Sequence, residues 1–583
     1  EKYFRKAVEK SIRSNPNPYD YEPYYNLGLS LKYQGKEKEA YDVFYKAIWG
    51  GSFQAPGFYE LACLDAKAGR FAEALEHVNE SILRQYQCMK ARALKENILR
   101  KLGRVKEAEE LHKESLKIDP LYDRQPEKIN HNTLLELVID LYEAGDYAQG
   151  ITLAEKWVKQ QNVSRQEDIY PLVYYYIAYG YQNLHRKENT EQANCYMTMY
   201  VTLGENAAAD GCFPHRTEDY IVLKSLAEEY HLAMAYYYLG CLLYDRRVYD
   251  ESIEDYEESI LRSPDFPTVH RNLALAYYNV KKLPQRAYEE MEKAFALDET
   301  DARVYLELDQ LKKRLNVAVK ERWSDMEKHF DLVESRDDLY LEYVTLLNTL
   351  GEPEKALGLI KARKFHQWEG GEGKVAAQYL TALYQLAKAA VEKEDYAEAK
   401  ELLLRAVGEY PHNLGEGKLE SGQENNLYYL LGLVQEKLGE AKDAFESLTR
   451  ACCGESEPVG MMYYNDQPPE MIYYQGLAYR MLGEEEQAVR RFQKLVDYGR
   501  EHIRDDVKID YFAVSLPDLL IFEENLNERN RKHCLFMMSL GLKGLGRIDE
   551  AEKCAEELLA MDNAHQEIRV HDLVKKLENE RLE

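Results

Sequence analysis

Apolar residues recur at helical spacing on both sides of a short polar turn in residues 235–267. One apolar stripe runs from Leu239 to Leu243, and the polar residues 245–247 follow it. A second stripe runs from Ile253 to Ile260, and Pro264 comes shortly after it. Stripes of this spacing indicate amphipathic helices, and a proline beyond the last apolar position marks the end of a helix. The stretch therefore predicts one helix–turn–helix unit.

The same pattern returns after 34 residues. Leu239 and Leu273 are 34 residues apart, and the small residues Gly240 and Ala274 recur beside them. The same spacing separates Ala40, Ala74 and Ala108. A 34-residue unit with large, small and aromatic positions in this order resembles the tetratricopeptide repeat (TPR). One helix pair cannot bury its apolar face alone, so the resemblance implies an all-α solenoid of stacked pairs that forms a right-handed superhelix.

The repeat pattern divides the chain into five predicted regions. They are a remnant helix at 1–20, an N-terminal block at 21–203, a central block at 204–300, long connecting helices at 301–338, and a C-terminal block with loop insertions at 339–583. The remnant matches the second helix of a repeat and starts at Glu1 rather than methionine, so we expect a fragment of a longer protein. We expect about a dozen helix pairs. The last helix, about Gln566 to Leu582, is charged enough to be a solvated cap.

The chain is strongly acidic. It has 103 Asp and Glu residues against 76 Lys and Arg, which gives a formal net charge of −27. Such a surface repels phosphate groups, so we predict no nucleic-acid partner and no membrane partner. The nine cysteines are scattered and include no C-x-x-C pair, which argues against a disulfide framework or a zinc site and favours a reducing, cytoplasmic location.

The most unusual local feature is a doubled loop. Residues 365–374 read FHQWEGGEGK and residues 411–418 read PHNLGEGK, so Gly-Glu-Gly-Lys occurs twice. Each copy follows the second helix of a predicted pair, and loops of one class lie along one edge of a solenoid, so the two should be neighbours. Together they would place eight side chains on one rim: His366, Trp368, Glu369, Glu372, Lys374, His412, Glu416 and Lys418. Two interpretations stay open, a polar binding site with an aromatic platform, and a set of turns and helix caps.

A second candidate surface is aromatic. Repeats of this family that clamp the C-terminal carboxylate of chaperones carry a lysine and, four residues later, an asparagine in the first helix. The matching positions here hold Tyr25 with Leu29, Tyr237 with Cys241, and Arg271 with Leu275, so a cationic clamp is not expected. Instead we predict an aromatic concave face that suits peptides with apolar side chains, or sugars. Its candidate residues are Tyr25, Tyr237, Tyr429 and Tyr473.

Motifs of catalysis are missing from the sequence. Neither Gly-Glu-Gly-Lys copy fits G-x-x-x-x-G-K-[ST], Ser515 lacks a G-x-S-x-G elbow, and no H-E-x-x-H occurs. We therefore predict no catalytic residue, metal or cofactor, and whether the protein is an enzyme stays open. The apolar insertion at 510–518 is predicted to pack against the C-terminal repeats or to contribute to a binding site.

Longer stretches resemble a narrower, uncharacterised group of bacterial proteins. They are YYYLGCLLYDRRVYDESIEDYEESI, VHRNLALAYYN, FHQWEGGEGK, NLGEGK and DYFAVSLPDLLIF. In that group a domain of unknown function, a β-sandwich, precedes a long TPR array, and the resemblance covers the chain from about Pro16 onward. Gln367 stands where relatives are expected to have proline. Members resemble proteins found beside sugar-degrading enzymes, which implies an association with carbohydrate metabolism.

Two functions follow from these observations. The first is a non-enzymatic scaffold that binds a protein or peptide in its concave groove. The alternative is a carbohydrate-binding or glycan-processing module, in which the doubled loops complete a site with a missing N-terminal domain. Glycoside hydrolysis needs two carboxyl groups, and Glu369, Glu372 and Glu416 are the candidates.

Overall fold

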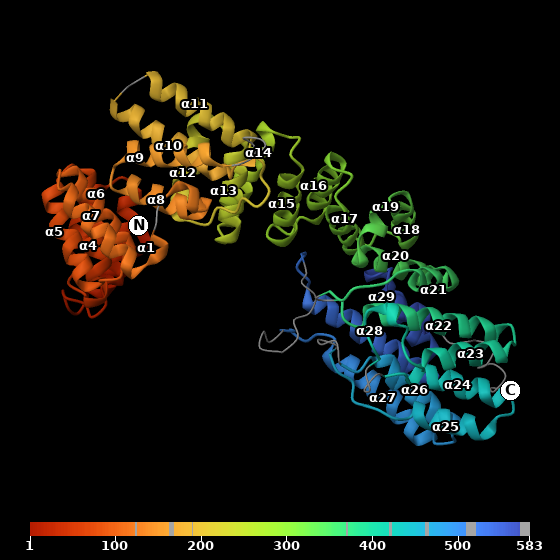
Figure 1. The fold of residues 1–583 in the computed structure, drawn as a ribbon. Coiled ribbons are helices and arrows are strands. Elements are labelled where there is room, and N and C mark those ends of the chain that lie inside the picture. Colours follow the sequence, from red (N-terminus) through yellow and green to blue (C-terminus); the bar gives the residue numbers. More distant parts are fainter. Residues whose placement is uncertain are drawn as a thin grey trace. The chain divides into compact units, whose positions relative to one another are not determined.

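The computed structural model describes most of the chain in eight ranges. These are 1–122, 125–161, 168–188, 191–368, 371–418, 423–460, 466–508 and 521–571. Helices build the fold, and no residue of these ranges forms a strand (Figure 1). The predicted all-α class is confirmed. The insertion at 510–518 and Glu369 lie outside the described residues.

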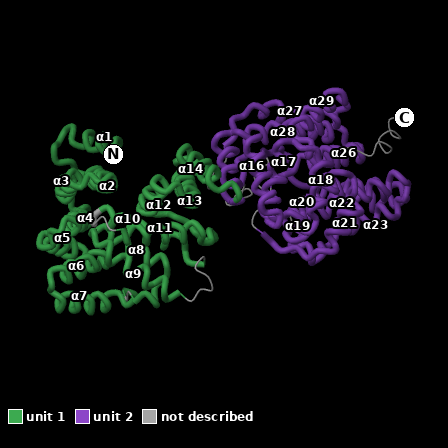
Figure 2. Tube along the Cα trace, turned by 90° about the horizontal axis from the view of Figure 1, so that it is seen from above, with its two compact units in different colours: residues 1–265 green, residues 266–583 purple. Residues whose placement is uncertain are grey.

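Contacts divide the protein into two compact units, unit 1 with residues 1–265 and unit 2 with residues 266–583 (Figure 2). The helices of unit 1 are α1 (Lys2–Ser11), α2 (Glu22–Tyr33), α3 (Glu37–Ala47), α4 (Gln54–Lys67), α5 (Phe71–Arg84), α6 (Met89–Lys101), α7 (Val105–Ile118), α8 (His131–Glu143), α9 (Tyr147–Gln160), α10 (Pro171–Glu188), α11 (Glu191–Asn206), α12 (Thr217–Tyr230), α13 (Ala233–Asp245) and α14 (Tyr249–Arg262). The boundary between the units falls inside the predicted central block at 204–300, so that block is not one compact body.

Unit 2 contains the remaining helices. They are α15 (Pro267–Asn279), α16 (Pro284–Leu297), α17 (Ala302–Arg314), α18 (Val319–Lys328), α19 (Phe330–Ser335), α20 (Asp337–Leu350), α21 (Pro353–Ala362), α22 (Lys374–Glu392), α23 (Tyr396–Ala406), α24 (Asn425–Lys437), α25 (Ala441–Ala451), α26 (Pro469–Met481), α27 (Glu485–His502), α28 (Leu526–Gly544), α29 (Ile548–Met561) and α30 (Gln566–Val570).

Successive helices pack in pairs, as the repeat pattern predicts. Within the described ranges we find twelve such pairs: α2/α3, α4/α5, α6/α7, α8/α9, α10/α11, α13/α14, α15/α16, α20/α21, α22/α23, α24/α25, α26/α27 and α28/α29. The first helices of neighbouring pairs also contact one another, for example α8 with α10 and α24 with α26. We call the surface that these first helices form in each unit its first-helix face.

A missing side chain lets the two helices of a pair approach closely. A Cβ atom on Gly240 would lie 2.5 Å from Cδ1 of Tyr256, and one on Gly476 would lie 2.5 Å from Cε1 of Phe492. These distances are below van der Waals contact, so the first helix carries glycine where the second helix presents a ring. The pairing of a small residue with an aromatic one, which the sequence repeats, is thus a direct packing contact.

The turn inside a pair often contains a residue in the left-handed conformation. Gly35, Gly69 and Gly103 are one repeat apart and have φ of 71°, 78° and 74°. In the α13/α14 pair Arg247 takes this place with φ of 61°. A residue with a side chain is less stable than glycine in this conformation by about 1–2 kcal/mol. The sequence therefore favours glycine at the turn, although the fold tolerates Arg247.

Two parts of the chain depart from the predicted elements. Residues 301–338 form three separate helices, α17 to α19, of 13, 10 and 6 residues instead of long connecting helices. Asn316 ends α17 at φ of 58°, a turn conformation that the apolar pattern does not reveal. The predicted solvated cap at 566–582 is also wrong where it is described, because Gln566, Val570 and His571 are buried.

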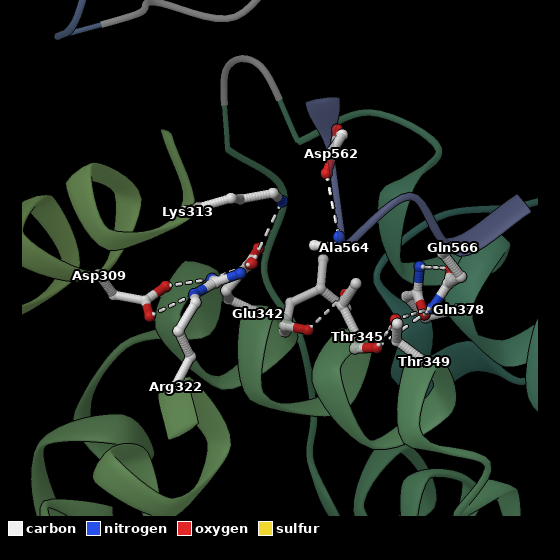
Figure 3. A network of polar contacts seen from close by, with 11 residues as sticks. Asp309, Lys313, Arg322, Glu342, Thr345, Thr349, Gln378, Asp562, Ala564 and Gln566 are labelled. Atoms are coloured by element: carbon white, nitrogen blue, oxygen red, sulfur yellow. Dashed lines mark hydrogen bonds and ion pairs between the residues drawn. The ribbon is translucent and has the colours of Figure 1, made fainter. Parts of the chain in front are cut away.

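A buried ion network holds three helices of unit 2 together. The Arg322 guanidinium on α18 donates to both carboxylate oxygens of Asp309 on α17, at 2.9 and 2.6 Å, and to Glu342 on α20 at 2.7 Å (Figure 3). Lys313 lies 3.2 Å from the same Glu342 oxygen. Against the effect of burial, Lys313 and Arg322 lower the pKa of Glu342 to about 2. Two cations thus face two carboxylates, and the network is balanced in charge.

Candidate binding surfaces

The doubled loops do lie side by side, as the sequence predicts. The Phe365 amide donates to the Asn413 carbonyl oxygen at 2.8 Å. The Asn413 side chain in turn donates to the carbonyl oxygens of Ile360 and Arg363, at 2.8 and 2.9 Å. A network of backbone contacts therefore joins the loop before α22 to the loop before α24.

Two charged residues of the second loop are used inside the fold. The Glu416 carboxylate accepts hydrogen bonds from the amides of Gly373 and Ala376, both at 2.8 Å. It therefore caps the start of α22, where free amides and the helix dipole favour a negative charge. The Lys418 ammonium donates to the Val407 carbonyl oxygen at 2.6 Å and pairs with Glu424 at 2.7 Å. For these two residues the structure agrees with helix caps and turns.

The other rim residues remain nearer to solvent. The His366 imidazole is 79% exposed and lies 3.2 Å from Asp337. Trp368 is half-buried, and its ring covers Gly371, where a Cβ atom would lie 2.2 Å from the indole. Three further rim residues are exposed: Glu372, Lys374 and His412. A ligand role for the rim stays a prediction.

The four candidate tyrosines do not form an exposed aromatic face. Tyr237, Tyr429 and Tyr473 are 8%, 9% and 1% exposed. Their rings lie in aromatic clusters of the core, such as Tyr473 with Phe492 at 5.6 Å between ring centres. Tyr25 is half-buried. The rings of Tyr237 and Tyr473 contact the second helix of their own pair, and the ring of Tyr429 contacts Tyr474 on α26, so these three positions do not supply the predicted exposed face.

A hollow of about 180 Å³ opens on the first-helix face of unit 1. It is lined by α2, α4, α8, α9, α10 and α12, and we call it the unit 1 hollow. Five tyrosines contribute to its wall: Tyr33, Tyr142, Tyr147, Tyr176 and Tyr179. Because these residues come from helices far apart in the sequence, no single stretch of the chain reveals the hollow.

A cluster of charges lies beside this hollow, and two of its members, Lys32 and Glu143, line it. The Lys32 ammonium lies 2.7 Å from Glu60 and 2.9 Å from Glu143, and all three side chains are at least 89% buried. Lys90 lies 3.1 Å from Asp140 and 3.6 Å from Glu143. We call these five residues the unit 1 charge cluster. It holds three carboxylates against two ammonium groups, so it carries an excess negative charge when all are ionised.

Burial and charge act differently on the carboxylates of this cluster. Burial raises the pKa of Glu60, with Lys32 opposing it. For Glu143 burial also acts upward, but Lys32 and Lys90 together hold its pKa below the ordinary value. Glu143 therefore stays ionised at neutral pH and supplies negative charge to the wall of the hollow.

The tyrosine hydroxyls of the hollow are tied to acceptors. The Tyr33 hydroxyl on α2 donates to the Glu218 carboxylate on α12, and the Tyr142 hydroxyl donates to the Tyr176 carbonyl oxygen at 2.9 Å. Burial raises the pKa of Tyr33 and of Tyr142, so both stay neutral. These bonds hold the rings in place and leave the hollow with aromatic walls and two ionisable glutamates, Glu143 and Glu218.

Unit 2 presents a different first-helix face. Residues 562–571, which include α30, lie across it and contact α20, α22 and α26. We call these ten residues the 562–571 segment. The Gln566 amide contacts Thr349 on α20 and Gln378 on α22, as Figure 3 shows. The chain thus fills in unit 2 the kind of surface that it leaves hollow in unit 1.

In the described ranges, no cluster of His, Cys, Asp and Glu has the geometry to hold a metal ion. None of the described helices combines the length and the apolar character that crossing a membrane requires. All nine cysteines are described and none is in a disulfide.

Two sequence models of the tetratricopeptide repeat match the chain. One matches residues 59–123 and 384–458, and the other matches residues 470–498. The matched segments contain pairs such as α4/α5, α24/α25 and α26/α27, which have the predicted helix–turn–helix form. The chain is a tetratricopeptide-repeat protein. Its TPR helix pairs offer surfaces for protein–protein interaction.

Several solved structures are similar to this TPR protein. Yeast Tom70 is 11% identical, with 95% of this chain and 99% of that chain covered and a TM-score of 0.24. The Cut9 and Hcn1 hetero-tetramer of APC/C gives 14% identity, 95% and 96% coverage and a TM-score of 0.24. The TPR domain of P58(IPK) gives 14% identity, 80% and 99% coverage and a TM-score of 0.18. The family assignment rests on the repeat models and the helix pairs, not on these low scores.

Proposed function

We propose that this protein is a non-enzymatic interaction scaffold whose unit 1 binds a segment of a partner protein at the unit 1 hollow. The observation that carries the proposal is the hollow itself, which is lined by residues of six helices. A concave site with aromatic walls and a few polar groups is the usual form of a binding site. The side chain of a bound peptide is the right scale for a hollow of about 180 Å³.

The charges around the hollow favour a basic side chain. The unit 1 charge cluster carries one carboxylate more than it has ammonium groups, and Glu218 adds another. Lys67, which also lines the hollow, is paired with Glu37 at 2.7 Å. The cluster's ammonium groups already contact carboxylates, so an acidic or phosphorylated partner would find no unpaired cation among them. A Lys or Arg side chain in the hollow would lie close to the carboxylates of Glu143 and Glu218.

The tyrosine rings add a second attraction for a cation. A Lys or Arg group over the face of an aromatic ring gains about 0.5–2 kcal/mol, more when it is shielded from water. The acidic composition of unit 1 as a whole, with 33 Lys and Arg against 43 Asp and Glu in residues 1–265, would also speed the approach of a basic partner.

The proposal can be tested with peptides selected from a random library on the full chain. Each selected peptide is made again with its basic residues replaced by glutamine, and its affinity is measured by fluorescence anisotropy. We expect glutamine peptides to bind at least ten times more weakly. Glu218→Gln should weaken the binding of the basic peptides by a similar factor. Glu228→Gln, on the exposed side of the same helix, should leave their binding unchanged.

A variant that blocks the hollow tests where peptides bind, independently of which side chains they prefer. Ile221 lines the hollow, and Ile221→Trp should fill it and abolish the binding of every selected peptide. If this variant binds normally, partner binding at the hollow is refuted. If it abolishes binding but the glutamine peptides bind as well as the basic ones, the site stands and the preference for a basic side chain is refuted.

Of the other predictions made from the sequence, the proposal includes the reducing location but not the carbohydrate function. A reducing compartment such as the cytoplasm fits nine cysteines without a disulfide. The carbohydrate alternative and the link to a group of bacterial proteins stay predictions. No contact in the described structure favours the carbohydrate alternative, and Glu416, one of its three candidate carboxylates, is engaged as a helix cap.

A further inference from the structure

The 562–571 segment is anchored on unit 2 by three buried residues. Gln566, Val570 and His571 are 8%, 6% and 8% exposed, whereas Glu567 and Arg569 between them face solvent. Gln566 and Val570 are four residues apart and lie on one side of α30, and His571 follows the end of the helix. The segment therefore presents one face to unit 2 and the other to water, in the manner of a bound helical peptide.

The first anchor is an amide in a polar pocket. The Gln566 side chain donates to the Thr345 carbonyl oxygen and to the Thr349 hydroxyl, both at 3.1 Å. Its own oxygen accepts from the Gln378 amide at 2.9 Å. Donor and acceptor of the amide are both satisfied, and Figure 3 shows the three partners around it. An uncharged amide fits this pocket, and an apolar or acidic side chain does not.

The second anchor is an aromatic pocket. The His571 ring lies 5.7 Å from the Tyr384 ring and 5.5 Å from the Tyr474 ring, and its Nδ1 is 3.1 Å from the Tyr474 hydroxyl. Next to it the Lys388 ammonium donates to the Val570 carbonyl oxygen at 2.8 Å. The pocket thus accepts a neutral ring and a chain carbonyl, with a cation close by that disfavours a second positive charge.

A third contact fixes where the segment begins. The Asn563 amide donates to the Asn316 side chain at 2.8 Å, and the Asn563 side chain donates to the Asn316 carbonyl oxygen at 2.6 Å. Asn316 lies in the turn between α17 and α18, and it also donates to the Ala560 carbonyl oxygen at 3.1 Å. Contacts to the segment therefore extend from this turn to α26.

The segment has little stability of its own. Its helix, α30, has five residues, and helices this short do not form alone in water. Most of the anchoring contacts are single hydrogen bonds to neutral groups, each worth about 0.5–1.5 kcal/mol. Segments held in this way open without unfolding the rest of the molecule.

We propose that the first-helix face of unit 2 is a second peptide-binding site, whose resident ligand is the chain's own 562–571 segment. The site takes a short helix that carries an uncharged amide, then an apolar residue and a neutral ring at the fourth and fifth positions after it. A partner segment of this chemistry reaches the site only when the 562–571 segment leaves it.

The test uses the full chain and a labelled synthetic peptide of residues 562–571. In the double variant Gln566→Ala/His571→Ala the chain loses both of its polar anchors. We expect the peptide to bind this variant at least ten times more tightly than the wild-type chain in fluorescence anisotropy. A peptide that carries the same two alanines should not bind. Glu567→Ala, which changes an exposed residue of the same segment, should behave as wild type.

Two results would overturn the proposal. The first is a double variant that keeps its helical circular dichroism and melting temperature but does not bind the peptide. The second is a double variant that unfolds unit 2, because an exchangeable ligand can leave without unfolding its site. Hydrogen exchange on the wild-type chain gives an independent measurement. The amides of 562–571 should exchange at least a hundred times faster than those in the middle of α22, and equal rates would show that the segment is a fixed part of the fold.

Discussion

In unit 1 the first helices leave a hollow of about 180 Å³, whereas in unit 2 the corresponding helices carry ten residues of the same chain. Both faces are rich in tyrosine, so the aromatic residues do not decide which face is open. The difference lies in the polar groups. Unit 1 presents charged Lys and Glu side chains, whereas the segment in unit 2 contacts the neutral Gln378, Thr349 and Tyr474 and one charged group, Lys388.

The buried ion networks of the two units also differ in their balance of charge. In unit 2 Arg322 and Lys313 face Asp309 and Glu342, which leaves no excess charge. In unit 1 the charge cluster has one carboxylate too many, and it borders the hollow. A balanced network serves the stability of the fold, and an unbalanced one beside an open surface is able to attract a partner.

The largest expected effect tests the balanced network. Arg322→Met leaves Asp309 buried without its cation and leaves Glu342 with Lys313 alone, and loss of one partner from a buried ion network lowers the free energy of unfolding by about 3–5 kcal/mol. Urea unfolding followed by hydrogen exchange should show this loss in α17, α18 and α20, with unit 1 unchanged. Arg303→Met on α17 removes an exposed guanidinium from Glu307, which keeps its pair with Arg271 at 2.6 Å, and should change little. A loss below about 1 kcal/mol for Arg322→Met would show that the network is not structural.

The next effect concerns the core of unit 1. Gly240→Leu forces a side chain against Tyr256, where even a Cβ atom would lie 2.5 Å from the ring, and overpacking of this kind lowers stability by about 1–3 kcal/mol. Thermal unfolding measures the loss. Gly358→Ala is the matched control, because a Cβ atom there meets nothing within 4 Å. An unchanged melting temperature for Gly240→Leu would mean that the pair contact is wrong.

Acid should weaken the contact between the 562–571 segment and the first-helix face of unit 2. Burial, with Lys388 and His565 adding to it, lowers the pKa of His571 to about 3, whereas an unfolded histidine titrates near 6.5. The folded state thus holds His571 neutral, so its contribution is complete above pH 6.5 and is lost as the pH falls toward 3. Between pH 7 and pH 5 the loss reaches about 2 kcal/mol at most.

Hydrogen exchange of the 562–571 segment at the two pH values measures this effect, after correction for the intrinsic rate. Glu470 on α26 acts in the opposite sense, because burial, with Glu567 adding to it, raises its pKa to about 8 and its proton favours the fold at low pH. The comparison of wild type with His571→Gln isolates the histidine. Equal pH dependence in the two proteins would contradict the assignment.

The smallest effect concerns the turns that both units share. Arg247→Gly relieves a left-handed residue at φ of 61° and should raise the unfolding free energy by about 0.5 kcal/mol, the steric relief less the entropy of glycine. The reverse change, Gly35→Arg at φ of 71°, should lower it by a similar or larger amount. Melting temperatures of both variants check the sign. A loss of stability for Arg247→Gly would mean that its side chain has an unseen role.

The sequence predicts what lies within one repeat and misses what lies between distant repeats. The contact of Gly240 with Tyr256 follows from the period, and so does the neighbourhood of the doubled loops. The cap that Glu416 forms on α22 does not, because it depends on a carboxylate 43 residues away from Gly373. The unit 1 hollow is equally hidden, since Lys32 and Glu218 meet there only through the stacking of the helices.

The 562–571 segment shows a further limit of prediction from the hydrophobic pattern. Residues 566–582 are charged, and their pattern favours a solvated cap. Only three of the ten residues in the 562–571 segment are buried at its anchors, and a short run of this kind gives no helical stripe long enough to recognise. The prediction of an exposed face of tyrosines has a related limit. A ring at a repeat position can point into the core or toward the surface, and the spacing along the sequence is the same in both cases.

The two residues of the Gln378–Gln566 contact are added to the growing chain at different times. Gln378 and Gln566 are 188 residues apart, and a ribosome that adds 5–20 residues per second needs about 10–40 s to pass from one to the other. During that interval α22 and later α26 are completed, and from then until Gln566 is added the segment that will cover them is not yet made. Every newly made chain therefore passes through a period in which its second binding site is vacant, and a partner present at the ribosome meets that site before the chain's own segment does.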